Sequence, residues 1–88
     1  MKLIGTNKYV KDSKIAQRRG KDLEKLRHIL NLLVQRKPLP FSCHVHKLTG
    51  NWAGTWECHI EPDWLLIYEC REDAIILHRT GSHADLFV

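Results

Sequence analysis

The clearest periodic pattern in the chain is a helical apolar stripe between Leu23 and Val34. Leucine, isoleucine and valine recur there at spacings of three and four residues, and charged side chains fall outside the stripe. Pro38 and Pro40 end the pattern, because proline lacks the amide hydrogen that a helix requires. We therefore predict an amphipathic helix over this segment, with its apolar side turned toward a core.

A weaker helical pattern precedes it, from Lys8 to Arg19, and residues 2–4 predict a short strand at the start of the chain. Gly20 follows two arginines, which is typical of a helix C-terminus. Asp22 then places negative charge where a second helix would begin. The first half of the chain is thus expected to form two helices joined at Gly20 as an antiparallel hairpin.

The second half predicts a sheet. Three segments have the length and the apolar or alternating pattern of strands: residues 55–60, 64–68 and 74–77. The connections at 61–63 and 71–73 are short and polar, which favours antiparallel hairpins. The tail, residues 81–87, ends in apolar side chains and is expected to fold back onto the sheet. The predicted architecture is α+β, with the helical hairpin packed on one side of a small antiparallel sheet.

The size of the chain limits it to one domain. It has 88 residues, of which 43% are hydrophobic, and a chain of this size buries roughly 60–65% of its unfolded surface. We expect a single domain spanning residues 1–88. No apolar run approaches the roughly 18 residues of a membrane span, and lysines stand where a secretory signal has its apolar stretch. The sequence therefore predicts a cytoplasmic protein without a membrane segment.

The net charge of +4 hides an uneven distribution. Residues 1–47 hold 12 Lys and Arg against 3 Asp and Glu, a balance of +9, whereas residues 48–88 hold 2 against 7, a balance of −5. A basic half suits a polyanionic partner such as RNA or DNA, because phosphate contacts dominate nucleic-acid affinity. A pair of solvated, lysine-rich helices would give the same charge pattern.

Histidine is unusually frequent, with six in the chain. Four of them lie at loops or at the ends of predicted elements: His44, His46, His59 and His83. A tight turn at Pro62 would bring His59 beside Asp63. The chain lacks the motifs of a serine nucleophile and of a phosphate-binding glycine loop. Metal-free cleavage of RNA suits such a set, because the substrate's 2′-OH is the nucleophile and the protein moves protons and neutralises charge.

Each candidate residue has a role in that chemistry and a purely structural alternative. Imidazole exchanges protons near neutral pH, Arg79 can grip a phosphate with its planar fork, and an aromatic ring can stack on an unpaired base. The aromatic candidates are Trp64, Tyr68 and Phe87. Conversely, His59 is compatible with an ordinary exposed position and His83 with a local backbone bond. Asp63 would serve equally as a turn cap and Arg79 as a partner of Asp73 or Glu72, while the aromatic rings would fit in the core.

Cysteine and histidine together raise a metal alternative. The segments 43–46 (Cys-His-Val-His) and 58–59 (Cys-His) offer thiolate and imidazole ligands for Zn²⁺. Neither a C-x₂-C pair nor an H-x₃₋₅-H spacing occurs, so this signal is weak, and no metal or cofactor is expected. Cys43, Cys58 and Cys70 are odd in number and widely spaced, which favours a reducing compartment and buried, small hydrophobic side chains.

Three blocks of sequence stand out: residues 46–50 (HKLTG), 59–68 (HIEPDWLLIY) and 79–87 (RTGSHADLF). Together they closely resemble the YafQ branch of the RelE-like bacterial toxins. The sharpest parts are the HxEPDW and RTGxHxxLF motifs, and the helical first half agrees in pattern and length. The resemblance implies a RelE-like, microbial-RNase-like α+β fold and a toxin of a type II toxin–antitoxin pair.

Toxins of that family cut mRNA in the ribosomal A site and are held inactive by a cognate antitoxin. By motif position, the resemblance implies a catalytic set of His46, His59, Asp63 and His83, with Arg79 at the phosphate and with Trp64 and Phe87 shaping the site. Within that set we expect His83 as the general acid, Asp63 or His46 as the base, and His59 in an orienting or charge-sharing role. The basic helices would face ribosomal RNA. Two alternatives stay open, a non-catalytic RNA-binding inhibitor of translation and a small zinc-binding protein.

Overall fold

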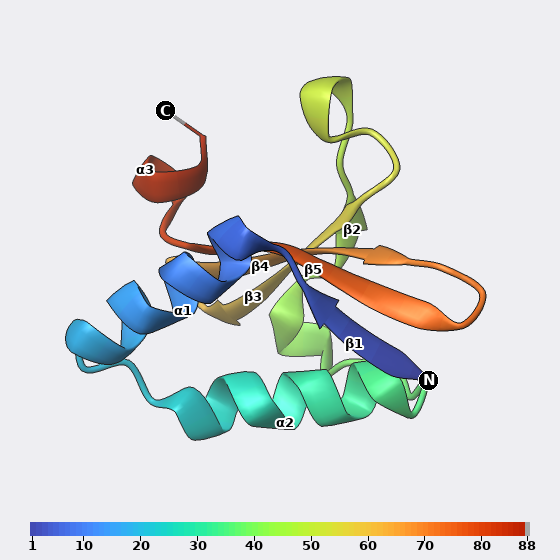
Figure 1. The fold of residues 1–88 in the computed structure, drawn as a ribbon, viewed down its shortest axis with the longest axis horizontal. Coiled ribbons are helices and arrows are strands. Elements are labelled where there is room, and N and C mark those ends of the chain that lie inside the picture. The colour runs from blue at the N-terminus through green and yellow to red at the C-terminus, as the bar shows by residue number, and fades with distance from the viewer. Residues whose placement is uncertain (88) are drawn as a thin grey trace.

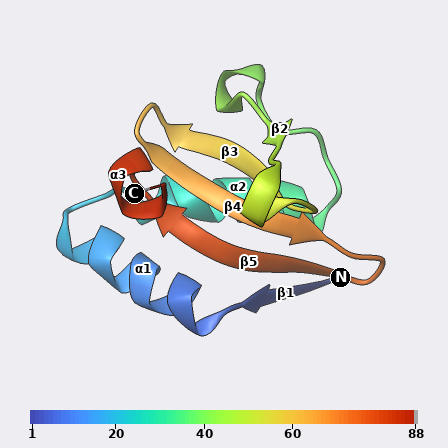
Figure 2. The same cartoon turned by 90° about the horizontal axis from the view of Figure 1, so that it is seen from above.

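The computed structural model describes residues 1–87, which form a five-stranded sheet with three α-helices around it (Figures 1 and 2). The strands are β1 (Lys2–Gly5), β2 (His46–Lys47), β3 (Trp56–Glu61), β4 (Trp64–Cys70) and β5 (Ala74–Gly81). The helices are α1 (Asn7–Arg18), α2 (Leu23–Val34) and α3 (His83–Leu86), and two 3₁₀ turns, η1 and η2, cover Phe41–Cys43 and Gly50–Trp52.

The ends of the helices follow from local sequence. The Thr6 hydroxyl accepts a hydrogen bond from the Tyr9 amide at the start of α1, and the Asp22 carboxylate accepts one from the Glu24 amide at the start of α2. These contacts satisfy amides that have no partner inside the helix. Gly20 adopts a positive φ of 79° after α1, a conformation that glycine adopts readily. The predicted junction between the two helices is confirmed.

The sheet has the strand order β1-β5-β4-β3-β2. The pairs β2–β3, β3–β4 and β4–β5 are antiparallel, as the short connections predict, whereas β1 pairs with β5 in parallel. The α+β prediction is confirmed, but the sheet is mixed where a wholly antiparallel one was expected. The reason is that most of the chain separates β1 from β5 in the sequence. No short hairpin connects the two strands, so none requires them to be antiparallel.

Two layers cover the sheet. Helix α2 lies across one face and buries Leu26, Ile29 and Leu33 against side chains of β3, β4 and β5 (Figure 1). Helix α1 packs along β5, so the two helices contact the sheet more than each other. Helix α3 covers part of the opposite face, where Leu86 packs with Leu65 and Ile67. The predicted return of the tail onto the sheet is confirmed, and α3 is the form it takes.

The β3–β4 hairpin places polar side chains on the face opposite α2. Its turn is Pro62-Asp63, and the pairing register shifts between His59 and Glu61, which marks a bulge. Side chains alternate along a strand. Cys58 is fully buried in the core under α2, so Glu57 and His59 lie on the other face. The hairpin therefore places an acid, Glu57, and an imidazole, His59, on the sheet face that α2 leaves free.

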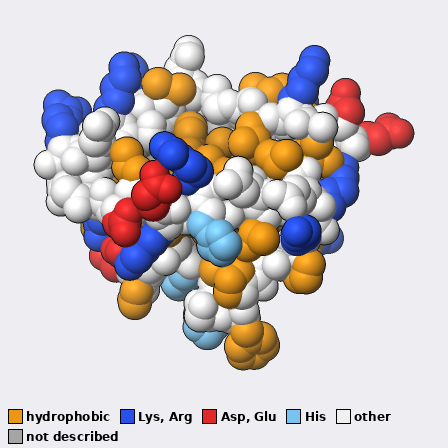
Figure 3. Space-filling model, turned by 90° about the horizontal axis from the view of Figure 1, so that it is seen from below, with side chains coloured by type: hydrophobic (Ala, Val, Ile, Leu, Met, Phe, Trp, Pro, Cys, Tyr) orange, Lys and Arg blue, Asp and Glu red, His pale blue; other side chains and the backbone are white. Residues whose placement is uncertain are grey.

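The surface mixes charges more evenly than the sequence does. On the face seen from the α2 side, Lys and Arg side chains are spread widely, and acidic side chains lie in two groups, one beside basic side chains and one at the edge of the face (Figure 3). Ion pairs join the two halves of the chain, since Lys21 and Lys25 both bind Glu61, at 3.1 and 3.0 Å.

None of the helices in residues 1–87 has the length and apolarity that crossing a membrane would take. Cys70 is exposed, which corrects the expectation that all three cysteines are buried.

Candidate active site

Three imidazoles stand in a row on the free face of the sheet. His46 comes from β2, His59 from β3 and His83 from α3. The ring centroids of His46 and His59 are 6.5 Å apart, and those of His59 and His83 are 5.7 Å apart. Residues separated by up to 37 positions in the sequence thus meet around His59, as the predicted catalytic set requires.

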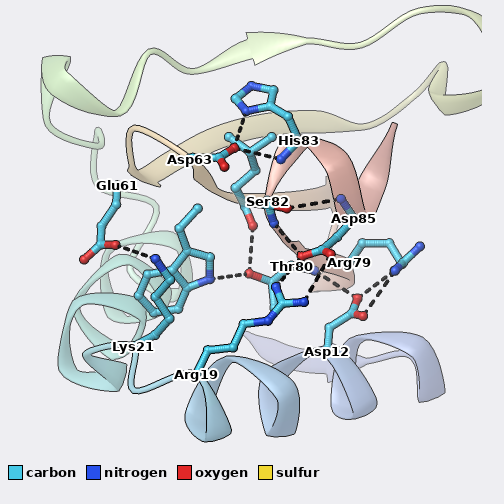
Figure 4. Close-up of polar contacts among 12 residues, drawn as sticks. Asp12, Arg19, Lys21, Glu61, Asp63, Arg79, Thr80, Ser82, His83 and Asp85 are labelled. Carbon is cyan, nitrogen blue, oxygen red and sulfur yellow. Dashed lines mark hydrogen bonds and ion pairs between the residues drawn. The ribbon is translucent and has the colours of Figure 1, made fainter. Parts of the chain in front are cut away.

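Asp63 fixes the orientation of His83. Its Oδ1 accepts hydrogen bonds from the His83 backbone amide at 2.9 Å and from the His83 ring Nδ1 at 2.6 Å (Figure 4). The backbone bond first, and then the ring bond, hold the pKa of the Asp63 carboxyl below its usual value. A carboxylate at Nδ1 keeps the proton on that nitrogen, so Nε2 is the ring nitrogen left to exchange protons with a substrate.

Glu57 contacts the rings of His46 and His59 from within the sheet face, and nothing in the sequence had assigned it a role. Its Oε1 is 3.1 Å from His59 Nε2 and 3.5 Å from His46 Nε2, and the residue is only 5% exposed. His46 is paired directly across from Glu57 in the β2–β3 ladder, which brings the two side chains together. The signal in the sequence was the spacing of two between Glu57 and His59, which puts both on one face of β3.

The remaining ring nitrogen of His46 has a backbone partner. Its Nδ1 lies 2.9 Å from the carbonyl oxygen of His44, and only a protonated nitrogen can donate to a carbonyl. Nε2, which lies 3.5 Å from Glu57 Oε1, is therefore the ring nitrogen left to exchange a proton with a substrate. At the far end of the row, the ring centroid of Phe87 is 6.5 Å from that of His83, and Phe87 is 43% exposed.

Arg79 lies in a neighbouring cavity of about 330 Å³ between α1, β5 and the start of α3 (Figure 4). Its Nε and one terminal nitrogen bind the Asp12 carboxylate at 2.6 and 3.1 Å, and Asp12 also accepts the Thr80 amide at 3.2 Å. Asp12 is therefore the partner of Arg79, where Asp73 and Glu72 were the acids considered from the sequence. Asp63 lines the same cavity, so Arg79 lies on the side of the site next to the His83–Asp63 pair.

Trp64 and Tyr68 are core residues, at 1% and 4% exposure. Trp64 donates through Nε1 to the Thr80 hydroxyl at 3.0 Å, which in turn donates to the Leu65 carbonyl at 2.7 Å. Neither ring offers a free face, which corrects the idea that they stack on a base. Trp64 lines the Arg79 cavity as a wall, whereas Phe87 is accessible.

The possible metal ligands differ from the cysteine–histidine set that the sequence left open as an alternative. Within residues 1–87, the ligand atoms of Glu57, His59 and His83 lie within 4.8 Å of one another, and this group contains no cysteine. Burial raises the pKa of the Cys58 thiol to about 12, so this thiol stays protonated and is a poor ligand. The Cys43 side chain is buried in the core beneath α2. The cysteine–histidine zinc set that the sequence offered as a weak alternative is therefore not assembled.

Comparisons with known proteins agree with this fold. The family model described as bacterial toxin of type II toxin-antitoxin system, YafQ, matches residues 1–88. The chain is 43% identical over 83 residues to the mRNA interferase toxin YafQ of Escherichia coli K12, covering 93% of this chain and 90% of that protein. These matches place it among small bacterial toxins.

Two solved structures extend the likeness. The YafQ chain in the E. coli DinJ–YafQ toxin–antitoxin complex superposes with a TM-score of 0.91 at 41% identity, covering 98% of this chain and 96% of that one. A copper-bound mutant toxin from Helicobacter pylori gives a TM-score of 0.94 at 36% identity, covering 99% of each chain. The chain belongs to the YafQ family of type II toxin–antitoxin toxins.

Proposed function

We propose that this chain is an endoribonuclease that cleaves mRNA on the ribosome by metal-free acid–base catalysis, and that a cognate antitoxin holds it inactive. The observation that carries the proposal is the row of His46, His59 and His83, backed by the carboxylates of Glu57 and Asp63. The E. coli relative named an mRNA interferase toxin supports the substrate class. The DinJ–YafQ complex supports an antitoxin partner.

The reaction needs one group to accept a proton and another to return one. His46 Nε2 takes the proton of the substrate's 2′-OH, and the 2′-oxygen then bonds to the adjacent phosphorus. The bond from phosphorus to the 5′-oxygen breaks, and His83 gives that oxygen a proton through Nε2. The products are a 2′,3′-cyclic phosphate and a new 5′-hydroxyl end, with no electron or metal required for balance.

The other members of the row act through these two. Asp63 is held by two hydrogen bonds from His83, so it is a positioning residue for the acid, and His46 is the base. His59 lies between the acid and the base with its Nε2 on the buried Glu57. Held there, the His59 ring is placed to orient the phosphate and to share the extra negative charge that develops on it in the transition state.

Arg79 and Phe87 complete the site on the His83 side. Asp12 accepts hydrogen bonds from Nε and Nη2 of Arg79. Within residues 1–87 the second terminal nitrogen of Arg79, Nη1, has no such partner and is available to a phosphate oxygen. Phe87 offers an accessible ring next to His83 for an unpaired base. Trp64 supports the wall of the Arg79 cavity from the core.

The basic helices are the proposed contact with ribosomal RNA. If about six phosphates are engaged, affinity for the ribosome falls roughly a thousandfold between about 50 and 200 mM salt. The same basic surface suits an acidic or amphipathic segment of the antitoxin. Ribosomes and mRNA are cytoplasmic in bacteria, so the proposed activity implies a cytoplasmic protein.

A transition metal held by Glu57, His59 and His83 would inhibit the reaction, because it would occupy the nitrogens that act on the substrate. The copper-bound toxin from H. pylori makes copper the metal to test. We expect toxin that has been treated with EDTA and dialysed into Mg²⁺ buffer before the ribosomes are added to cleave at an unchanged rate. Cu²⁺ added to the toxin should reduce cleavage, and a second treatment with EDTA and dialysis should restore it. Loss of cleavage by the treated toxin in Mg²⁺ buffer, recovered by an added transition metal, would overturn the metal-free mechanism.

The experiment is induced expression with and without the antitoxin, combined with mapping of transcript 5′ ends. We expect growth arrest and new 5′ ends within coding regions, both suppressed by the antitoxin and both lost in His83→Gln. His78→Gln is the matched control, because His78 pairs with Glu69 away from the row. Growth arrest without new ends would instead support an RNA-binding inhibitor that acts by occupancy.

A further inference from the structure

The side chain of Phe41 is 96% exposed, the highest exposure among the large hydrophobic residues of the described chain. It begins the 3₁₀ turn η1 (Phe41–Cys43), whose last residue, Cys43, is buried in the core under α2. Leu39, just before the turn, also packs on that core. The turn is therefore anchored at both ends and holds Phe41 out in solvent, where a phenyl ring adds nothing to the stability of the fold.

Phe41 lies at the end of a continuous line of rings. Its ring centroid is 6.4 Å from that of His44, and the His44 ring stands edge-on to His59 at 5.8 Å. From His59 the line continues to His83 and then to Phe87, at 5.7 and 6.5 Å. The three proposed catalytic imidazoles are thus flanked by two accessible phenyl rings, and His44 makes the connection to Phe41.

The backbone holds this arrangement in place. His44 has φ 47° and ψ 53°, in the left-handed region that residues with a Cβ rarely occupy. Its amide donates to the Phe41 carbonyl at 3.1 Å, and its own carbonyl accepts from His46 Nδ1 at 2.9 Å. The unusual conformation of His44 therefore ties the exposed ring of Phe41 to the orientation of the proposed base.

His44 also separates two hollows in the surface. One, of about 460 Å³, is bounded by Phe41, His44 and His46 among others. The second, of about 480 Å³, is bounded by His44 and His59 together with the β3–β4 turn. Both fall within the size range of small-ligand sites, about 300–1,000 Å³. A strand of RNA whose phosphate lies over His59 would bring the base of an adjoining nucleotide to this part of the surface.

We propose that Phe41 and His44 form a base-stacking subsite for the nucleotide that supplies the attacking 2′-OH. The polarity follows from the row itself, and this inference rests on the proposed function. The base, His46, is on the Phe41 side, and the 2′-OH belongs to the nucleotide 5′ of the scissile bond. The acid, His83, is on the Phe87 side, and it serves the 5′-oxygen of the nucleotide that follows.

Stacking on aromatic rings accepts any base, because every base has a π-face. The subsite therefore sets affinity and the placement of the substrate, and moves no proton itself. Phe41 acts on binding, so its loss should appear in the toxin concentration that gives half-maximal cleavage. The maximal single-turnover rate should change far less, since His46, His59 and His83 remain.

The test is single-turnover cleavage of mRNA bound to ribosomes, measured over a range of toxin concentrations. We expect Phe41→Ala to raise the half-saturating concentration about 5- to 100-fold, with a maximal rate within about threefold of the unaltered protein. Phe41→Trp should restore the half-saturating concentration. Ile4→Ala, which trims another exposed apolar side chain, on β1 and outside the basic helices, is the control and should match the unaltered protein.

A substrate arm tests the assignment to one nucleotide. Removing the nucleobase 5′ of the scissile bond should raise the half-saturating concentration of the unaltered protein by the same factor as Phe41→Ala does. The half-saturating concentration of Phe41→Ala should not rise further on this substrate. If removal of the 3′ nucleobase, and not the 5′ one, has no further effect in Phe41→Ala, the assignment of Phe41 to the 5′ nucleotide is wrong. An unchanged half-saturating concentration in Phe41→Ala would overturn the subsite itself. Weaker antitoxin binding with unchanged cleavage would assign Phe41 to the antitoxin instead. Because the unaltered protein is measured alongside, failure of the proposed function shows separately, as absence of cleavage.

Discussion

Two polar regions of the molecule lie side by side and differ in what their groups are free to do. In the cavity beside α1, charged groups are matched in pairs: Asp12 with Arg79, and Arg19 with Asp85. In the imidazole row, two carboxylates serve three rings, and the outer rings, His46 and His83, each have about half of their side chain exposed. Pairing in the first region stabilises the fold, whereas the second keeps ring nitrogens available for a substrate.

The largest effect should come from an outer ring of the row. His46→Ala removes the proposed base, and we expect single-turnover mRNA cleavage to fall by on the order of 10² to 10⁴. Because the side chain is 53% exposed, the urea midpoint of unfolding should stay close to that of the unaltered protein. A rate within tenfold of the original, with the protein folded, would remove His46 from the mechanism.

The next largest effect should come from the buried acid of the row. Glu57→Gln keeps the shape of the side chain but removes the charge facing His59, and we expect cleavage to fall by on the order of a hundredfold. Glu69→Gln is a matched control, because Glu69 also binds a histidine, His78, at 2.9 Å. Equal losses in the two variants would show that a general effect of Glu–His pairs, and no special role of Glu57, is responsible.

In the paired cavity, a substitution should affect stability. Asp12→Asn leaves the largely buried Arg79 without its anionic partner, so we expect the free energy of unfolding to fall by about 1–3 kcal/mol. Urea denaturation followed by circular dichroism measures this loss. Unaltered stability would mean that the Asp12–Arg79 pair is not part of what holds α1 to β5.

The smallest effect should come from the more exposed pair, and it should depend on pH. Arg19 first, and then the Ser82 amide, lower the pKa of Asp85 well below its usual value. The folded state thus binds fewer protons than the unfolded state near pH 3, so this stabilisation is complete above about pH 4 and is lost as pH falls further.

Asp85→Asn should therefore lower the melting temperature by a few degrees at pH 7, and the difference from the unaltered protein should shrink in acid. Thermal melts at pH 7 and near pH 2 measure both values. A difference that stays constant or grows on acidification would contradict the assigned cause.

The sequence predicts those features of the fold that local patterns determine, and it does not predict those that depend on contacts between distant segments. The helix over 23–34 and the β3–β4 hairpin were predictable, because apolar spacing and turn residues act locally. The parallel pairing of β1 was not, since it depends on contacts across the whole chain. β2 has only two residues, Gly50–Trp52 is a single turn, and neither is long enough to show a period.

Within the candidate site, the motif resemblance named four residues that the structure brings together: His46, His59, Asp63 and His83. It left out Glu57 and Asp12, whose importance comes from a cross-strand neighbour and from a helix far away in sequence. It also left the buried state of Trp64 undetermined, because a tryptophan in a strand fits a core and a binding face equally well.

The most direct test of the central claim, that His83 donates the proton to the leaving oxygen, uses an mRNA with sulfur in place of the 5′-oxygen at the scissile bond. A thiolate leaves without protonation, so the acid becomes unnecessary. We predict that His83→Ala cleaves this substrate at a rate within about tenfold of the unaltered protein, while on normal mRNA it is slower by on the order of 10² to 10⁴. An equal deficit on both substrates would contradict the assignment of His83 as the general acid.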